Sequence, residues 1–401
     1  MSERIDKLTY RIRRKWREHK EKDPSGKSFI RYVFRFLFYK ILFFPHRFYS
    51  KGLETCSPDT VNIAVYLSGG LGDCVVGMRL LQQLSTLYPA CRFHLFYKTP
   101  AVLSWVSEAV PAVESVESAE LYDYFSRRLS DCAIRLNTFV KFDLTRINLR
   151  KIKRLAPGFA ERISISRQWE GMNRVFIDHH PTLDGAYARN AVALGWQRQD
   201  GLSRQLGLPP CDLTLALPCS DTKREEVAAR FKRYVTVNTG FDRFFIMSTE
   251  TATKCYPDAY WSGLVRLLKE NMPDLGVIQV GNGCSFHIPE VDLDLSGKTS
   301  LAECAGLLKG SLLHIDIEGG LVHVCASLGT RCAVLFGPTP PAYFGYPDNI
   351  NLRDENCSEC WWATERWMEC CPKNHPENVC MKRLTPERVF AAVRAHLQEH
   401  R

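Results

Sequence analysis

"VNIAVYLSGGLGDCVVGMRLLQQL", residues 61–84, decides the fold of this chain. Its first seven residues form a largely apolar run rich in β-branched side chains, which is typical of a buried strand. A glycine-rich turn follows, and the apolar residues of 76–84 then recur at helical spacing. The next runs, "RFHLFY" (92–97) and "AVLSWVSEAV" (101–110), repeat the alternation. This rhythm predicts a parallel sheet with helices on both faces.

A second series of the same kind follows residue 220 and continues to the last helix. The strands and helices predicted in it are, in order, "YVTVNTGF" (234–241), "PDAYWSGLVRLLKENMP" (257–273), "LGVIQVGNG" (275–283), "SLAECAGLLKGS" (300–311), "LLHIDIEGG" (312–320), "LVHVCASLG" (321–329), "RCAVLFGPTPP" (331–341) and "TPERVFAAVRAHLQEH" (385–400). Two such series predict an α/β protein with two Rossmann-like domains facing a cleft, where ligands bind at the carboxyl ends of the strands. The predicted domains are residues 52–220 and 221–401.

The first 51 residues differ from the rest of the chain in charge. They hold 15 Lys/Arg against 5 Asp/Glu, whereas the whole chain carries +9, so the remaining 350 residues are close to neutral. The segment "FIRYVFRFLFYKILFFPHRFY" (29–49) is rich in aromatic residues, but basic residues interrupt it. No apolar run approaches the ~20 residues that span a bilayer, and no signal-peptide cleavage site follows. We therefore predict a basic, aromatic, helical N-terminal arm over residues 1–51.

The arm suggests a partner. Arg31 and Arg35 would share a helical face with Lys27, opposite aromatic side chains. Such a face fits an anionic membrane surface; the alternative is a helix packed on the protein's own body or on another subunit. Nucleic acid is not expected, because an RNA-binding segment would more often interleave glycine and polar residues.

The turn "SGGLGD" (68–73) holds the first candidate site residues. Gly69, Gly70 and Gly72 permit close backbone approach and positive φ. Asp73 falls near a helix N-terminus, where the helix dipole favours the ionised carboxylate. The spacing is not the GxGxxG of dinucleotide-binding loops. A carboxylate base and an ordinary helix-capping aspartate both fit this pattern.

The stretch "EGGLVH" (318–323) carries a stronger ligand-binding signal. Gly319 and Gly320 open a predicted helix, so free backbone N–H groups can face an anion. Glu318 could accept hydrogen bonds from sugar or ribose hydroxyls, and His323 lies on the first helical turn. The functional interpretation is a cradle for a nucleotide-sugar, and the structural alternative is a glycine-rich connector with a core histidine.

Taken together, these motifs resemble glycosyltransferase family 9, the ADP-heptose heptosyltransferases of lipopolysaccharide synthesis. The matching motifs are "GGLGD" (69–73), "TKCYP" (253–257), "EGGLVH" (318–323), "SLGT" (327–330) and "FGPTPP" (336–341). The resemblance covers about residues 61–392 and is loose over 100–235. It implies a GT-B type fold, in which two Rossmann-like domains enclose the active site.

The resemblance also implies roles for individual residues. It assigns Asp73 as the catalytic base, Gly69, Gly70 and Gly72 to the acceptor-side loop, and Thr239, Lys254, Glu318, Gly319, Gly320 and His323 to donor binding. The implied reaction inverts the configuration at the anomeric carbon. It needs no catalytic metal, because Lys254 and the N–H groups near Gly320 stabilise the leaving diphosphate. The family's usual Asp and Ser are Glu318 and Gly319 here, which leaves the sugar and base of the donor open.

Five of the 16 cysteines fall in "CSECWWATERWMECCPKNHPENVC" (357–380), with the spacing C-x2-C-x9-C-C-x8-C. This spacing favours a tetrahedral structural site for zinc or iron. The preferred ligands are Cys357, Cys360, Cys371 and Cys380, with Cys370 as the alternative to Cys371. Free thiols and disulfides are the other interpretations. The remaining eleven cysteines lack a secretory context and are expected to be reduced, mostly buried thiols.

The resemblance implies transfer of heptose from ADP-heptose to a hydroxyl of the lipopolysaccharide core or another lipid-linked saccharide. One alternative is protein O-glycosylation, as in the autotransporter heptosyltransferases, which also carry a cysteine-rich metal finger. Another alternative is a non-catalytic nucleotide-sugar-binding protein. The expected partners are a nucleotide-sugar, a glycolipid or protein acceptor, the inner-membrane surface and a second copy of the chain. The expected location is the cytoplasm, peripheral to the inner membrane.

Overall fold

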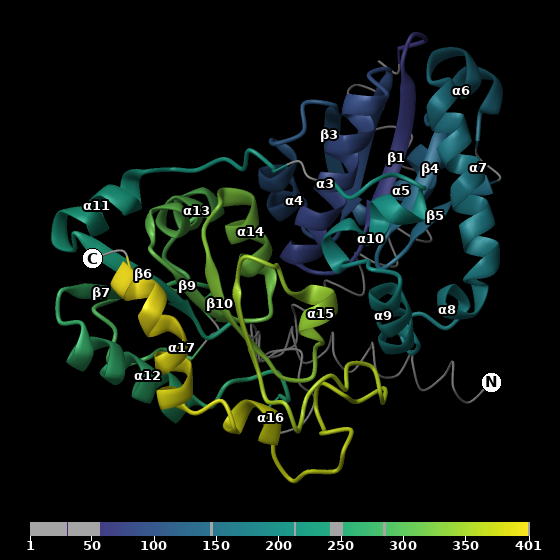
Figure 1. The fold of residues 1–401 in the computed structure, drawn as a ribbon. Coiled ribbons are helices and arrows are strands. Elements are labelled where there is room, and N and C mark those ends of the chain that lie inside the picture. Colours follow the sequence, from purple (N-terminus) through teal and green to yellow (C-terminus); the bar gives the residue numbers. More distant parts are fainter. Residues whose placement is uncertain are drawn as a thin grey trace.

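The computed structural model describes Ile30 and residues 57–144, 147–211, 214–240, 252–283 and 286–399. The predicted N-terminal arm therefore lies outside the described residues except for Ile30. Two α/β units lie side by side, each built around one sheet (Figure 1). The two-domain α/β fold expected from the sequence is confirmed.

The first unit has a five-stranded sheet in the order β3-β2-β1-β4-β5. Its elements are β1 (Val61–Leu67), α3 (Leu71–Leu87), β2 (Cys91–Tyr97), α4 (Pro100–Ser107), β3 (Val113–Ser118), the short 3-10 helix η3 (Ala119–Leu121), α5 (Tyr122–Arg128), β4 (Cys132–Leu136), β5 (Val140–Phe142), α6 (Leu149–Leu155), α7 (Pro157–Met172), α8 (Arg174–Asp178), α9 (Asp184–Ala193) and α10 (Arg198–Gln205). Strand β1 lies between β2 and β4 and pairs with both in parallel. Helix α3 leaves β1 at the carboxyl edge of this sheet, where ligands bind in such folds.

The last strand of the first sheet corrects the expectation of a purely parallel sheet. Strand β5 pairs with β4 in antiparallel fashion. Only residues 137–139 separate the two strands, which is too short for a parallel crossover and suits a hairpin. The irregular region that follows in the sequence forms helices α6 to α9 along one side of the sheet (Figure 1).

The second unit has a fully parallel six-stranded sheet in the order β11-β10-β9-β6-β7-β8. Its elements are α11 (Thr222–Arg230), β6 (Arg233–Asn238), α12 (Asp258–Asn271), β7 (Leu275–Gln279), β8 (Leu293–Asp294), α13 (Leu301–Gly310), β9 (His314–Ile317), α14 (Gly320–Leu328), β10 (Cys332–Phe336), α15 (Pro341–Phe344), β11 (Ile350–Arg353), α16 (Val379–Lys382) and α17 (Pro386–Glu399). Strand β10 is buried at every residue, as parallel strands covered by helices on both faces are.

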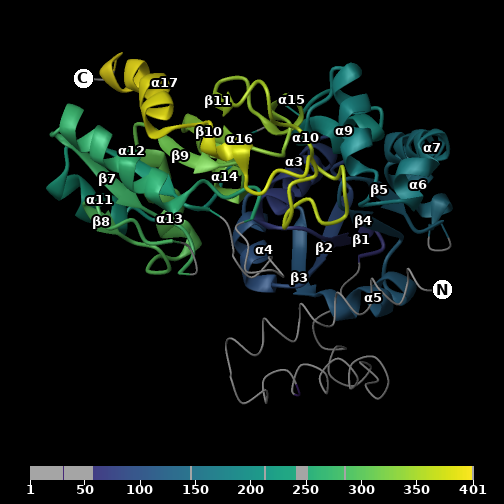
Figure 2. The ribbon, with the colours of Figure 1, turned by 90° about the horizontal axis from the view of Figure 1, so that it is seen from below.

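The two units share buried contacts. One cluster of buried apolar side chains runs from β1 and α3 of the first unit to α14 and β10 of the second. A second contact involves the cysteine-containing loop, residues 354–378, which crosses toward α9 of the first unit (Figure 2). There the ring of Trp361 lies 4.9 Å from Phe344, and Tyr343 lies 6.5 Å from Tyr187 of α9.

Within the described residues, no helix is both long and apolar enough to cross a membrane. The described cysteines are all free thiols, most of them buried.

Candidate active site

Asp73 is held by its own turn at the start of α3. The backbone N–H of Gly70 donates to Asp73 Oδ2 at 2.9 Å, so the carboxylate caps the helix. Gly69 adopts φ = 111°, and a Cβ at this position would lie 2.1 Å from Asp73 Oδ2. Glycine is therefore required at residue 69 by its backbone conformation and by the approach of the carboxylate. Tyr97 Oη fixes the turn further by donating to the Gly69 carbonyl at 2.9 Å.

Arg198, at the start of α10, forms an ion pair with Asp73. Its Nη2 lies 2.7 Å from Asp73 Oδ1 and also donates to the Asn137 carbonyl at 3.2 Å. The Arg198 side chain is only 6% exposed, whereas the Asp73 side chain keeps 40% exposure. Burial raises the pKa of Asp73, but the Arg198 guanidinium and the Gly70 N–H lower it by more, so the pKa lies below its usual value. Asp73 is therefore ionised at neutral pH and reachable from solvent.

The predicted donor-side residues gather at the carboxyl end of β9. Lys254 Nζ lies 2.6 Å from Glu318 Oε2, and both side chains are mostly buried. Gly319 follows with an extended backbone and is the N-cap of α14. No side chain caps this helix, so its first N–H groups, with the positive end of the helix dipole, are available to an anion. The structure thus places an ammonium group beside an uncapped helix N-terminus.

The first turns of α3 and α14 face each other across the two units, and glycines allow the contact. A Cβ at Gly72 would lie 2.4 Å from His323 Cδ2. A Cβ at Gly320 would lie 3.0 Å from the Leu71 side chain and 3.3 Å from the Gly72 nitrogen. Each helix therefore needs a glycine where the other approaches, and the contact brings Asp73 next to the donor-side residues.

His323 is a buried member of this contact. Its Nδ1 lies 2.7 Å from the hydroxyl of Tyr346. Burial lowers its pKa to about 4; the charge of Glu318 opposes this shift and that of Arg198 adds to it. The ring is therefore neutral at pH 7. Its Nδ1 therefore contacts the Tyr346 hydroxyl, and its Cδ2 faces Gly72.

Thr239 lies at the end of β6, in a loop that is anchored to β9. Its hydroxyl donates to the Phe286 carbonyl at 3.0 Å. The neighbouring Asn238 donates to the buried carboxylate of Asp316 at 2.9 Å and accepts from the Gly240 N–H at 3.0 Å. These bonds fix residues 238–240 at the end of β6. Among the contacts described, Thr239 bonds with neither Lys254 nor Glu318.

Sequence reasoning missed two groups at this site. Arg198 lies in the helix "RQDGLSRQ", which matches no motif, and its ion pair with Asp73 joins residues far apart in the sequence. Tyr346 follows the "FGPTPP" motif closely, and burial raises the pKa of its hydroxyl to about 12. The proximity of Tyr346 to that motif was the only sequence signal that could have indicated either residue.

The cysteine loop shows partial convergence of the predicted metal ligands. Burial raises the pKa of Cys380 to about 12, and Cys357, Cys360 and Cys371 add to this increase. The four preferred thiols are thus close enough to affect one another. In the part of the chain that the structure describes, however, no three His, Cys, Asp or Glu side chains are placed to hold a metal ion.

A pocket of about 530 Å³ lies beside this loop. Its lining includes Thr253, Glu369, Cys371, His375, Asn378 and Lys382. Of the predicted donor-side residues none lines this pocket, although Thr253 directly precedes Lys254.

Comparisons with known proteins show which sequences and folds this chain resembles. The model of the family "Glycosyltransferase family 9 (heptosyltransferase)" matches residues 202–376. Lipopolysaccharide heptosyltransferase 1 of Pseudomonas aeruginosa is 27% identical over 171 residues, which are 38% of this chain and 47% of that protein. The chain thus aligns with about half the length of this relative. Lipooligosaccharide heptosyltransferase 2 of Haemophilus influenzae is 20% identical over 305 residues, 71% of this chain and 85% of that protein.

Solved structures share the fold. The E. coli ADP-heptose lps heptosyltransferase II has a TM-score of 0.51 at 17% identity, covering 85% of this chain and 100% of that chain. The iron-containing dodecameric glycosyltransferase TibC from enterotoxigenic E. coli has a TM-score of 0.54 at 13% identity, covering 85% of this chain and 78% of that chain. In sequence the chain is thus similar to glycosyltransferase family 9 over residues 202–376 and to two heptosyltransferases, and it shares its fold with the solved heptosyltransferase structures.

Proposed function

We propose that this protein is an inverting, metal-independent glycosyltransferase that moves heptose from ADP-heptose to a hydroxyl of the lipopolysaccharide core or another lipid-linked saccharide. The observation that carries the proposal is the meeting of Asp73 from one unit with the Lys254–Glu318 pair and the α14 N-terminus from the other. The donor is supported by the E. coli heptosyltransferase with the same fold. The lipid-linked acceptor is supported by the two heptosyltransferase relatives.

The proposed reaction divides between the two units. Asp73 takes the proton from the acceptor hydroxyl as its oxygen attacks the anomeric carbon, and the bond from that carbon to the diphosphate breaks on the opposite face. Lys254 and the first N–H groups of α14 stabilise the negative charge that collects on the leaving diphosphate. Arg198 keeps Asp73 ionised and aimed, because its guanidinium is itself tied to the Asn137 carbonyl.

Replacing the base tests this assignment. Asp73→Asn should reduce transfer by about 10² to 10⁴-fold, the usual contribution of a positioned base, while ADP-heptose still raises the melting temperature. Asp274→Asn is the matched control, because Asp274 is exposed at the end of the α12–β7 connection. Transfer by Asp73→Asn at the control rate would refute Asp73 as the base. If the wild-type protein binds the donor but transfers sugar to no lipid-linked or protein acceptor, the result would instead favour a non-catalytic nucleotide-sugar-binding protein.

A protein acceptor is the second candidate, and the cysteine loop favours it, since TibC combines the same fold with iron. Incubating the protein with labelled ADP-heptose and separate lipopolysaccharide and protein acceptor fractions distinguishes the two. If only the protein fraction becomes labelled, the acceptor is a protein rather than a lipid-linked saccharide. The dodecameric neighbour also makes a homo-oligomer part of this proposal, and sedimentation velocity measures it directly.

We further propose that the cysteine loop and the start of α16 hold one structural zinc or iron through Cys357, Cys360, Cys371 and Cys380. The mutual effect of their thiols on the pKa of Cys380 supports this set. Such a metal would cross-link the loop that contacts α9 and would take no part in the sugar transfer. Elemental analysis of the purified protein should find about one metal per chain. Cys360→Ser should lose the metal, whereas Cys219→Ser, outside the loop, should retain it; a folded, active, metal-free wild type would contradict the proposal.

A further inference from the structure

Lys254 lies in a tight turn formed by residues 252–255. The Cys255 N–H closes this turn by donating to the Ala252 carbonyl at 2.9 Å. The Lys254 side chain extends from the turn to Glu318, where its Nζ lies 2.6 Å from Glu318 Oε2. Because a lysine side chain is a long and flexible stem, the position of its ammonium group depends on what holds the turn.

The cysteine-containing loop holds the residue before Lys254. The Thr253 hydroxyl donates to the Trp367 carbonyl at 2.7 Å, and the Thr253 N–H donates to the Met368 carbonyl at 2.9 Å. Thr253 is only 5% exposed, so water competes little for these two bonds. Residue 253 is therefore fixed to the loop by its side chain and by its backbone.

The same loop holds the residue after Lys254. Asn378, at the end of the loop, is the N-cap residue of α16, and its side chain reaches back to the turn. Its Nδ2 donates to the Cys255 carbonyl at 2.5 Å, and the residue is 6% exposed. Both neighbours of Lys254 are therefore bonded to one loop that lies more than a hundred residues later in the sequence.

These hydrogen bonds border the pocket of about 530 Å³ described above. Thr253 and Asn378 are both among its lining residues. Because the pocket adjoins both side chains, protein packing does not confine the turn on that side. There the turn is positioned by its hydrogen bonds to the loop.

The loop is itself attached to other parts of the site. The Trp361 N–H donates to the carbonyl of Pro338, in the "FGPTPP" segment, at 2.8 Å. A Cβ at Gly185 of α9 would lie 2.1 Å from the Trp361 carbonyl oxygen, so the loop also touches the first unit. The ring of Trp361 packs 6.4 Å from that of Trp367. The residue that accepts from Thr253 is therefore packed on a residue that contacts both units.

We propose that Thr253 and Asn378 are positioning residues for Lys254, through which the cysteine-containing loop sets the place of the ammonium group at the leaving diphosphate. The inference rests on the proposed role of Lys254 in the transfer. Neither residue touches the reacting atoms, and both act through Lys254. A cation that is already in place stabilises developing charge best. Because that charge grows as the bond to the diphosphate breaks, a displaced Lys254 should lower kcat more than it weakens binding of ADP-heptose.

Thr253→Val tests the first of these residues, because valine has a similar shape but no hydroxyl. We expect kcat to fall about 10-fold in Thr253→Val and in Asn378→Ala, part of the roughly 10²-fold that a displacement of about 1 Å can cost. The dissociation constant of ADP-heptose, measured by calorimetry, should change less than kcat. Thr253→Ser keeps the hydroxyl and should recover most of the rate.

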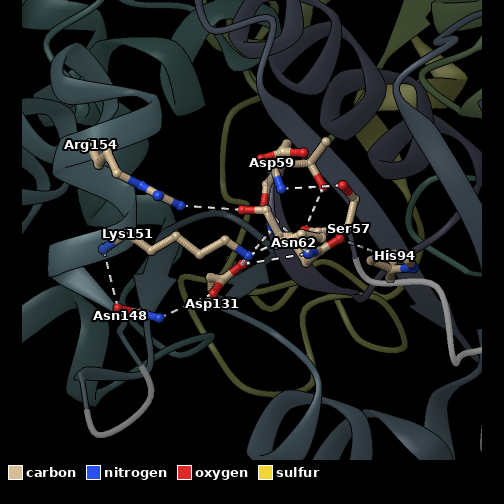
Figure 3. Close-up of polar contacts among 10 residues, drawn as sticks. Ser57, Asp59, Asn62, His94, Asp131, Asn148, Lys151 and Arg154 are labelled. Atoms are coloured by element: carbon tan, nitrogen blue, oxygen red, sulfur yellow. Dashed lines mark hydrogen bonds and ion pairs between the residues drawn. The ribbon is translucent and has the colours of Figure 1, made fainter.

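Asn148→Ala is the matched control for Asn378→Ala. Asn148 is the N-cap residue of α6, and its Nδ2 donates to Asp131 Oδ1 at 3.3 Å (Figure 3). Asp131 in turn accepts from the Asn62 N–H at the amino end of β1, whereas Asp73 follows the carboxyl end. This control should lower the melting temperature through loss of the cap and leave kcat unchanged. Thr86→Val, at an exposed position of α3, is the control for the threonine.

The variant Lys254→Ala decides whether the effect acts through Lys254. Adding Thr253→Val to Lys254→Ala should lower kcat by no more than about twofold, because no ammonium group remains to be positioned. A further 10-fold loss in that background would overturn the inference, as would full kcat in both Thr253→Val and Asn378→Ala. No transfer by the wild type, or wild-type transfer by Lys254→Ala, would instead refute the proposed function of the site and the inference with it.

Discussion

Gly72→Ala should separate the two units at the active site. The new Cβ would lie 2.4 Å from His323 Cδ2, whereas carbon atoms in contact lie at about 3.5–4.0 Å. The contact must therefore open by at least about 1 Å. His323 cannot turn aside without loss, because its ring is buried and its Nδ1 is bound to the Tyr346 hydroxyl at 2.7 Å.

An opening of this size should be visible in kinetics. A displacement of about 1 Å between reacting groups can cost about 10²-fold in rate, so kcat should fall by that order. Donor affinity should change less, because Lys254 and the α14 N-terminus belong to one unit. The measurement is kcat and KM for sugar transfer, with the donor Kd taken separately by calorimetry.

Gly70→Ala is the matched control. Gly70 lies two residues earlier in the same turn, has φ = −102°, and has no atom within 4 Å of its built Cβ. Its backbone N–H to Asp73 survives the substitution. If Gly72→Ala retains the activity of Gly70→Ala, the contact between α3 and α14 does not set the catalytic geometry, and the reasoning fails.

Three further substitutions probe other parts of the structure. Arg198→Ala should let the pKa of Asp73 rise, so the acid limb of the kcat/KM–pH profile should move to higher pH. Arg198→Lys should restore part of the shift. If the acid limb does not move in Arg198→Ala, Arg198 does not hold the pKa of Asp73 down. His94 is buried with its pKa lowered to about 4, so only the unfolded chain takes up a proton as pH falls below about 6.5, and the free energy of unfolding should drop by about 2 kcal/mol from pH 7 to pH 5. His94→Gln should remove that part of the drop in urea denaturation, and an identical pH dependence in both proteins would contradict the assignment. Gly185→Ala should destabilise the protein by about 1–3 kcal/mol, because its Cβ would lie 2.1 Å from the Trp361 carbonyl oxygen, whereas Gly171→Ala, with nothing within 4 Å, should not lower the melting temperature.

Local features of the fold could be predicted from the sequence because neighbouring residues cause them. The Ser300–Glu303 capping box is one example: Ser300 Oγ accepts from the Glu303 N–H at 3.2 Å, as a Ser and a Glu three residues apart at a helix start favour. The β1–α3 turn is another, because its glycines and Asp73 act on each other within five residues. The order of strands and helices followed from the same short-range patterns.

Contacts between distant segments could not be predicted in this way. No local pattern shows that Arg198 is buried against Asp73 or that His323 rests on Gly72. The hairpin of β5 was missed because a strand of three residues is too short for its alternation to be recognised. The cysteine spacing indicated ligands but not their positions, since these depend on how the loop packs against the first unit.

The buried cluster that joins the two units also bears on how the protein unfolds. It runs without interruption from Val61 and Leu84 to Val322 and Phe336. Cutting the chain between the predicted domains at residue 220 would therefore expose apolar surface on both halves rather than release two finished cores. Thermal unfolding should then appear as one cooperative transition, because the buried apolar contacts that stabilise the fold cross the predicted domain boundary.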